Sequence, residues 1–164
     1  VLELGAGCGL CGIVAARLCG ARRVLLSDLA EPTMVNLRHN LALNNLPPER
    51  AYAAPLNWFD PASWPAPVDA LVGSDLVYSA DAAPHLAAVV GALVAPGGVF
   101  LHCSPQSDGG QVAHRQGGQQ FIDAMLAAGW ECQQSAVPPA YLRNVLQGAD
   151  DEEFALLFGE LQTH

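Results

Sequence analysis

The sequence is poor in charge, and positive charge is the scarcest. Charged residues make up 14% of the 164 residues, and 7 Lys and Arg stand against 16 Asp and Glu, which gives a net charge of −9. A protein that binds a nucleic-acid backbone needs a basic face to neutralise the phosphates. The shortage of basic residues therefore argues against nucleic acid as the main partner. It permits a basic protein substrate, although acidity also serves solubility alone.

A long uninterrupted apolar run is missing as well. The longest, Leu86 to Leu101, is broken by Pro96-Gly97-Gly98, and a span of the bilayer takes about 20 apolar residues. We therefore expect no association with a membrane. With 51% hydrophobic residues, residues 1–164 are expected to form a single domain. The sequence starts at Val1, inside an apolar run and without Met, so an upstream segment is expected to be missing.

Neither the cysteines nor the histidines have the spacing of a metal site. The one close pair, Cys8-x-x-Cys11, has no second pair to complete a zinc site, and the five cysteines are an odd, scattered set. They are interpreted as small packing residues. The histidines are equally dispersed, at positions 39, 85, 102, 114 and 164. We expect no metal, and the unpaired cysteines favour an intracellular, cytoplasmic location.

The segment from Val1 to Asp28 carries the main signal that is present. A short apolar run predicts a buried strand, four glycines follow between Gly5 and Gly12, and an apolar helical pattern leads to a second strand, Arg23 to Ser27. Asp28 stands at the end of that strand. This order of strand, glycine turn, helix, strand and acid is typical of a unit that binds a nucleoside.

The spacing of the glycines admits two ligands. Gly7-x-Gly9-x-x-Gly12 matches the dinucleotide fingerprint, and Asp28 follows at about the expected distance of 20 residues. The strand ends at Leu4, however, so the turn starts at Gly5 and has an acid, Glu3, two residues before it. An acid there would repel a pyrophosphate and suits a cationic ligand such as S-adenosylmethionine (SAM). SAM is favoured over NAD.

Further alternation of strands and helices predicts a doubly wound, mostly parallel α/β sheet. Strands are expected at 51–56, 68–73, 99–103, 130–137 and 154–161, and helices start near Glu31, Ala82 and Phe121. The last two strands lack a full helix between them, so an antiparallel pair is expected at the edge. That would make seven strands. Ligands of such sheets lie over the carboxyl ends of the strands.

Three short motifs carry a resemblance to a known family. The sequence Glu3-Leu4-Gly5-Ala6-Gly7-Cys8-Gly9-Leu10 is similar to E-L-G-A-G-x-G-L, Leu56-Asn57-Trp58 to L-x-W, and Asp75-Leu76-Val77-Tyr78 to D-x-x-Y. In this combination the chain resembles methyltransferase family 16, a group of seven-strand class I SAM-dependent methyltransferases. Many members of that group methylate protein lysines. The match covers roughly residues 1–101, and the remainder fits only in outline.

The resemblance implies a set of site residues. Gly5, Ala6 and Gly7, in the pattern that runs on to Gly9, would wrap the methionyl part of SAM, and Asp28 would hold the ribose. Trp58 and the Ser74 backbone would flank the adenine. Asp75 and Tyr78 would face the methyl group and the incoming amine. The family's segment before the first strand, which supplies another aromatic contact, is not in this sequence.

Each of these side chains also has a structural alternative. Glu3 would be either a ligand residue or a strand acid satisfied by backbone amides. Asp28 would either hold the ribose or cap the helix that starts near Glu31. Trp58 would either bind adenine or belong to the core. Asp75 and Tyr78 would be either catalytic or a satisfied acid and a core ring.

The function expected from the resemblance is transfer of a methyl group from SAM to a lysine amine of a protein. A dry aromatic pocket would lower the pKa of that amine toward the neutral, nucleophilic form. Two alternatives stay open: a small-molecule methyltransferase, and a SAM-binding module without turnover. The substrate protein and the oligomeric state do not follow from the sequence.

Overall fold

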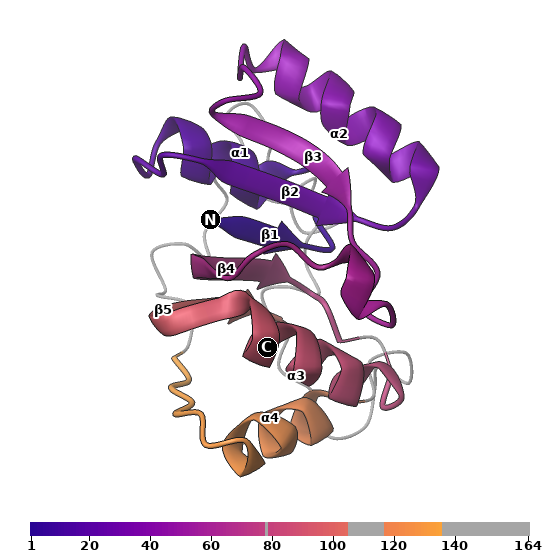
Figure 1. The fold of residues 1–164 in the computed structure, drawn as a ribbon, viewed down its shortest axis with the longest axis vertical. Helices are drawn as coiled ribbons and strands as arrows, with labels where there is room; N and C mark the ends of the chain where they lie inside the picture. The colour runs from indigo at the N-terminus through magenta and orange to yellow at the C-terminus, as the bar shows by residue number, and fades with distance from the viewer. Residues whose placement is uncertain (78, 105–116, 136–164) are drawn as a thin grey trace, which may run out of the picture.

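Five parallel strands form the central sheet of the protein (Figure 1). The structure, a computed structural model, describes residues 1–77, 79–104 and 117–135. The strands are β1 (Leu2–Leu4), β2 (Val24–Asp28), β3 (Ala51–Pro55), β4 (Val68–Ser74) and β5 (Val94–Cys103). Their order is β3-β2-β1-β4-β5. The chain therefore moves outward from β1 to β3 and then returns to place β4 on the other side of β1, which makes the gap between β1 and β4 the switch point of the topology.

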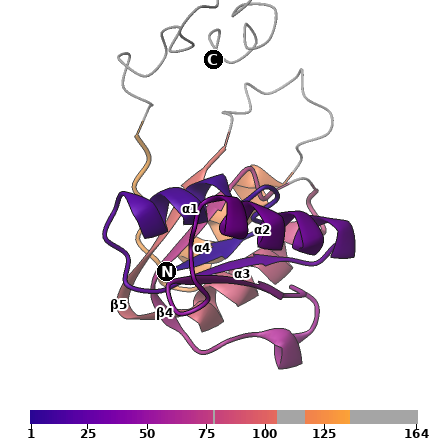
Figure 2. The ribbon, with the colours of Figure 1, turned by 90° about the horizontal axis from the view of Figure 1, so that it is seen from above.

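Helices cover both faces of this sheet. They are α1 (Leu10–Arg17), α2 (Glu31–Leu43), α3 (Ala82–Leu93) and α4 (Gly118–Ala127), with a short 3-10 helix η1 (Pro61–Ser63) after β3. Figure 2 shows α1 and α2 together on one side of the sheet. Their buried side chains, including Met34 and Leu37, pack with Val24 and Leu26 in one core cluster. The helices α3 and α4 contribute to a second cluster on the other face.

The alternation of side chains along β1 decides where its single acid lies. Leu2 and Leu4 are fully buried in the α3–α4 cluster. Since successive side chains of a strand point to opposite faces, Glu3 points to the face covered by α1. Its side chain is buried there, with 3% of its surface exposed. A charged group is thus enclosed beneath the first helix.

The doubly wound α/β fold is confirmed, but the expectation of seven strands with an antiparallel edge is wrong for the described residues. They contain five strands, all parallel. Of the strand expected at 130–137, residues 130–135 are not in a strand. The Trp130 amide instead donates to the Met125 carbonyl at 3.0 Å, and Gly129 has a φ of 85°, so this stretch ends α4. The strand expected at 154–161 lies outside the described residues.

Candidate active site

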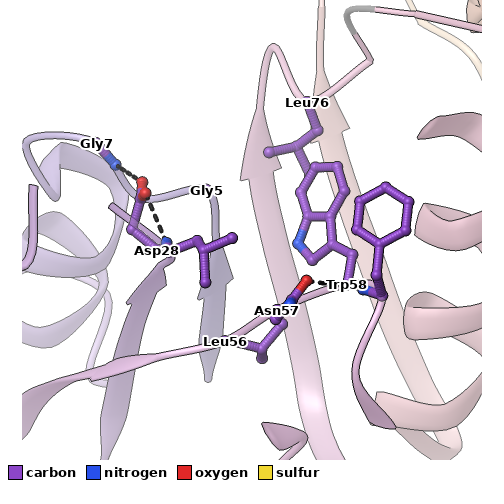
Figure 3. A pocket seen from close by; sticks show the side chains of 9 residues that line it. Gly5, Gly7, Asp28, Leu56, Asn57, Trp58 and Leu76 are labelled. Atoms are coloured by element: carbon purple, nitrogen blue, oxygen red, sulfur yellow. Dashed lines mark hydrogen bonds between the residues drawn. The ribbon is translucent and has the colours of Figure 1, made fainter. Parts of the chain in front are cut away.

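A pocket of about 390 Å³ lies at the carboxyl ends of the strands, beside the switch point (Figure 3). This volume is within the range of small-molecule sites, roughly 300–1,000 Å³. Segments that follow β1, β2, β3 and β4 all contribute to it. The lining residues are Gly5, Gly7, Asp28, Leu29, Leu56, Asn57, Trp58, Phe59 and Leu76.

The turn after β1 brings bare backbone to the pocket. Gly5 and Gly7 both have a φ of 54°, in the left-handed region that favours glycine. A Cβ atom on Gly5 would lie 2.8 Å from Cδ2 of Leu76 and 4.0 Å from the Trp58 ring. A side chain at Gly5 would therefore enter the part of the pocket that Leu76 and Trp58 line. The absence of that side chain keeps the pocket open.

Asp28 joins the end of β2 to the glycine turn. Its Oδ2 accepts the Gly7 amide at 3.1 Å, and its Oδ1 accepts the amides of Leu29 at 2.8 Å and Ala30 at 3.3 Å. An ionised carboxylate has about four lone-pair sites. Three are used here, so Asp28 retains capacity to accept a ligand hydroxyl. Figure 3 shows its carboxylate beside Gly7 on one side of the pocket.

Glu3 does not line the pocket but sits behind the glycine turn. Its Oε2 accepts a hydrogen bond from the Gly12 amide at 2.8 Å, and its carboxylate also accepts hydrogen bonds from Cys11. Both residues are in the first turn of α1, whose amides have no partner within the helix. Burial raises the pKa of Glu3 above its ordinary value, while the bonds from Gly12 and Cys11 act in the opposite direction. The N-terminus of α1 is therefore already occupied by a carboxylate.

The opposite wall of the pocket is the loop after β3. Trp58 projects into the space in Figure 3, with Leu76 next to its ring. The loop is held in shape by its own groups. The Trp64 indole Nε1 donates to the Asn57 carbonyl at 2.8 Å, and the Phe59 amide donates to Oδ1 of Asn57 at 3.0 Å. Because those bonds fix the backbone on both sides of Trp58, its ring forms a wall of the pocket without a ligand being bound.

The turn after β4 closes the third side. Asp75 has a φ of 55°, which is unusual for a residue other than glycine. Its amide donates to the Cys103 carbonyl at 2.7 Å, and the next amide, that of Leu76, donates to Nε2 of His102 at 3.2 Å. The Leu76 side chain is buried and folds back over Gly73. This turn is therefore anchored to the end of β5 by two consecutive amides.

Seven of the ten predicted site residues lie at the pocket, at the end of β4 or outside the described residues. Gly5, Gly7, Asp28 and Trp58 meet at the pocket. Ser74 is exposed at the end of β4, and Asp75 follows it in the turn. Tyr78 lies outside the described residues.

Besides Glu3, the two predicted residues that remain, Ala6 and Gly9, support the turn from beneath. The Ala6 amide donates to the Ser27 carbonyl at 2.8 Å. Gly9 is buried, with a φ of 84°, and a Cβ atom there would lie 2.6 Å from Leu26 and 2.8 Å from Leu37. Gly9 thus allows α1 to approach the core of the α2 face. Ala6 and Gly9 contact other residues of the protein and do not line the pocket.

Sequence reasoning assigned no role to five of the lining residues, namely Leu29, Leu56, Asn57, Phe59 and Leu76. Leu29 and Leu76 directly follow a predicted site acid, so position next to a strand end was the available signal. Phe59 is 62% exposed at the mouth of the pocket, where its ring lies 4.2 Å from that of His85 on α3. That contact joins segments far apart in the chain, and no local pattern predicts it.

The described residues contain no group of three or more His, Cys, Asp or Glu side chains that could hold a metal ion. None of their helices has both the length and the apolarity to span a bilayer. All five cysteines are free and exposed.

Comparison with known proteins identifies the family. Residues 1–127 match the family described as lysine methyltransferase. The chain belongs to the lysine methyltransferase family. The matched range includes every described strand and helix of the site.

Two curated relatives and one solved structure illustrate the similarity of this lysine methyltransferase family member to other proteins. Protein N-lysine methyltransferase METTL21A of Xenopus tropicalis is 35% identical over 107 residues, 65% of this chain and 44% of that protein. The electron transfer flavoprotein beta subunit lysine methyltransferase homolog of Caenorhabditis elegans is 32% identical over 60 residues, 37% of this chain and 24% of that protein. The chain thus spans less than half the length of either relative.

The fold is also that of a solved structure. PKMT2 from Rickettsia typhi, in complex with AdoHcy, superposes with a TM-score of 0.51 at 17% identity over 60% of this chain and 19% of that one. At this identity the likeness concerns the fold alone. It agrees with the Rossmann-like order of the five strands.

Proposed function

We propose that this protein is a SAM-dependent methyltransferase that acts on a lysine side chain of a protein. The observation that carries the proposal is the position of the Glu3 carboxylate at the N-terminus of α1. In a dinucleotide site the pyrophosphate lies on the N-terminal amides of the first helix. Here the Glu3 carboxylate accepts the Gly12 amide at that place. A pyrophosphate would meet a buried negative charge, whereas a cationic ligand would be attracted to it.

The pocket residues fit SAM in shape and in chemistry. Asp28 has acceptor capacity left for a ribose hydroxyl, and Gly5 and Gly7 admit the methionyl part without a Cβ in the way. Trp58 and Leu29 offer apolar faces for the adenine. Ser74 and Ala6 are proposed as further backbone contacts, with Glu3 and Gly9 shaping the turn from behind. The structure of PKMT2 with AdoHcy is consistent with this use of the fold.

SAM supplies a methyl group that is already activated by its sulfonium, so the protein's task is alignment and exclusion of water. Leu56, Trp58 and Leu76 provide an apolar wall. Such surroundings would lower the pKa of an incoming lysine amine and favour its neutral, nucleophilic form. We assign the orientation of that amine to Asp75 and Tyr78, which follow β4 in the chain; the arrangement of Tyr78 is not described.

A protein substrate is proposed because both relatives are named as lysine methyltransferases, and both names specify a protein as the substrate. The net charge of −9 is compatible with a basic partner and unfavourable for nucleic acid. Five free, exposed cysteines favour a reducing, intracellular setting. We further propose that residues 1–164 belong to a single catalytic domain.

The test compares cofactors first and substrates second. Calorimetry of the full-length protein is expected to show binding of SAM and none of NAD; the reverse would contradict the proposal. Tritiated SAM is then incubated with the protein and a cell lysate, with Asp28→Ala as control. Label in protein bands, mapped to lysine by mass spectrometry, supports the proposal. Label confined to small molecules would identify a small-molecule methyltransferase, and SAM binding without any transfer would identify a binding module.

A further inference from the structure

His102 is a histidine that the proposed reaction does not use, yet it touches the wall of the pocket. It lies on β5, where it is paired in register with Gly73 of β4. Its Nε2 accepts the Leu76 amide at 3.2 Å. An imidazole that accepts through Nε2 is neutral and carries its proton on Nδ1. The bond therefore exists in one protonation state of the ring only.

The ring of His102 is held by its surroundings. The Phe100 ring stacks at 5.7 Å with an interplanar angle of 12°, and the Phe121 ring of α4 meets it edge-on at 6.2 Å. The side chain is half-buried. A ring packed in this way cannot easily rotate to offer another atom, so Nε2 is a fixed acceptor aimed at the turn after β4.

That turn needs an anchor, because it contains an unfavourable backbone conformation. A positive φ at a residue other than glycine costs on the order of 1 kcal/mol or more and persists only where neighbouring contacts enforce it. Asp75 has this conformation, and the amides of Asp75 and Leu76 are the two that β5 holds. The first bond goes to a carbonyl, which does not titrate. The second goes to His102, which does.

We propose that His102 is a positioning residue for the site, which holds the Asp75–Leu76 turn in its pocket-forming shape while its imidazole is neutral and releases it when the imidazole is protonated. The ring with two N–H groups has no acceptor left for the Leu76 amide. Leu76 then loses its anchor, and the pocket loses the wall that the Leu76 side chain forms near Gly5. This inference rests on the proposed function, because it describes how one wall of the SAM site is kept in place.

The charges around the ring set the direction of the effect. Burial lowers the pKa of His102 below its ordinary 6.5, and the negative charge of Asp75, on the turn after β4, acts in the opposite direction. The side chains that face the ring from β5 and α4, Phe100 and Phe121, do not titrate. The anchored form thus prevails at neutral pH, and loss is expected on the acidic side, below about pH 6.5.

Three substitutions separate the effect of the acceptor from that of packing. His102→Gln offers a side-chain oxygen in place of Nε2 that does not titrate. His102→Leu removes the acceptor and retains an apolar side chain. His39→Gln, on the exposed surface of α2, is the matched control that changes a histidine elsewhere. Thermal unfolding of all variants shows whether each is folded before it is compared.

The first measurement follows the Leu76 amide by NMR in the full-length protein. In the wild type its chemical shift is expected to titrate together with the His102 ring between about pH 8 and pH 5, and in His102→Gln it is expected not to. Absence of a common titration in the wild type would overturn the inference. This readout needs no methyl transfer, so it remains decisive even if the proposed function fails.

The second measurement is the dissociation constant of SAM and the rate of transfer over the same pH range. The wild type is expected to bind SAM about 5- to 10-fold more weakly on the acidic side, with His102→Gln flat by comparison and His102→Leu weak at every pH. Other carboxyls that titrate, including Glu3, are common to all variants. If His102→Gln retained the full acidic loss of the wild type, the anchoring role would be wrong. If no variant bound SAM at any pH, the proposed function would fall instead.

Discussion

The Asp28 carboxylate accepts the Gly7 amide at 3.1 Å, which ties the end of β2 to the turn after β1. This bond places the acid at the edge of the pocket and also steadies the glycine turn. Asp28 therefore has two roles: its carboxylate holds the backbone of the turn, and its remaining lone pair is available to a ligand.

Replacement of Asp28 by Ala is expected to weaken SAM binding by about 10- to 100-fold, because hydrogen bonds to a charged group each contribute roughly 1.5–3 kcal/mol. Calorimetry gives the dissociation constant. Glu31→Ala is the matched control: Glu31 is also acidic and three residues along, but its contact is an exposed pair with Arg38 at 3.5 Å. Unchanged affinity in Asp28→Ala would contradict the assignment of the ribose site.

Replacement of Glu3 separates its charge from its hydrogen bond. Glu3→Ala leaves the buried Gly12 amide without its acceptor and is expected to lower the free energy of unfolding by about 1–3 kcal/mol. Glu3→Gln retains an oxygen acceptor and is expected to be milder. Chemical denaturation at neutral pH measures both changes. A loss in Glu3→Gln as large as that in Glu3→Ala would show that the charge itself stabilises the helix.

The wild type and Glu3→Gln are also expected to differ in how their unfolding free energy depends on pH. The pKa of Glu3 is raised by burial above its ordinary 4.5, so the unfolded chain releases this proton at lower pH than the folded one. The contribution of Glu3 to stability is therefore present below about pH 4.5 and is lost as the pH rises through its folded pKa. The difference in unfolding free energy, wild type minus Glu3→Gln, is expected to decrease over that window. A difference that does not vary with pH would contradict this direction.

Replacement of Gly73 and of Gly91 by Ala forms a further test, because Gly73 is tightly packed and Gly91 faces open space. A Cβ atom on Gly73 would lie 2.9 Å from Cγ of the buried Leu76, whereas one on Gly91, in α3, meets nothing within 4 Å. Gly73→Ala is expected to cost about 1–3 kcal/mol of stability and to weaken SAM binding by displacing Leu76. Gly91→Ala is expected to stabilise the helix by about 0.5–1 kcal/mol. Thermal unfolding and calorimetry on both variants would show the contrast, and equal behaviour would argue against a packed Leu76.

Replacement of Trp58 tests the aromatic wall. Stacking of a base on an aromatic ring contributes roughly 1–3 kcal/mol, so Trp58→Ala is expected to weaken SAM binding by about 10-fold or more, and Trp58→Phe by less. Trp130→Phe is the control, since Trp130 packs against the α3–α4 core and does not line the pocket. Equal affinities in Trp58→Ala and the wild type would place the adenine elsewhere.

Local patterns in the sequence predicted the part of the site whose residues are near one another in the chain. The strand, the glycines, the helix and Asp28 are within the first 28 residues, and the structure confirms that unit as β1, α1 and β2. The choice between the two ligands considered for the glycine turn, SAM and NAD, depends on one acid, Glu3. Its position on the α1 face follows from the alternation of β1, but its bond to Gly12 required the arrangement of the helix.

Other features depended on contacts between distant segments. The His102 ring reaches Leu76 because β5 pairs in register with β4, and Phe59 meets His85 across the pocket mouth. The expected strand at Trp130 failed for a related reason. An apolar residue after a glycine suits a strand or a helix end equally, and here the Met125 carbonyl and the core of α3 and α4 determine the outcome.

The central position of β1 has a consequence for how the protein is made. Leu2 pairs with Leu25 on one side and with Leu71 on the other. During synthesis on the ribosome, β1 and β2 emerge before β4, so the edge of β1 that pairs with β4 stays open until β4 has been translated. Closure of that long loop slows folding, and the nascent chain exposes an apolar edge in the interval. Folding of this domain is therefore expected to complete late and to benefit from chaperones that shield the half-built sheet.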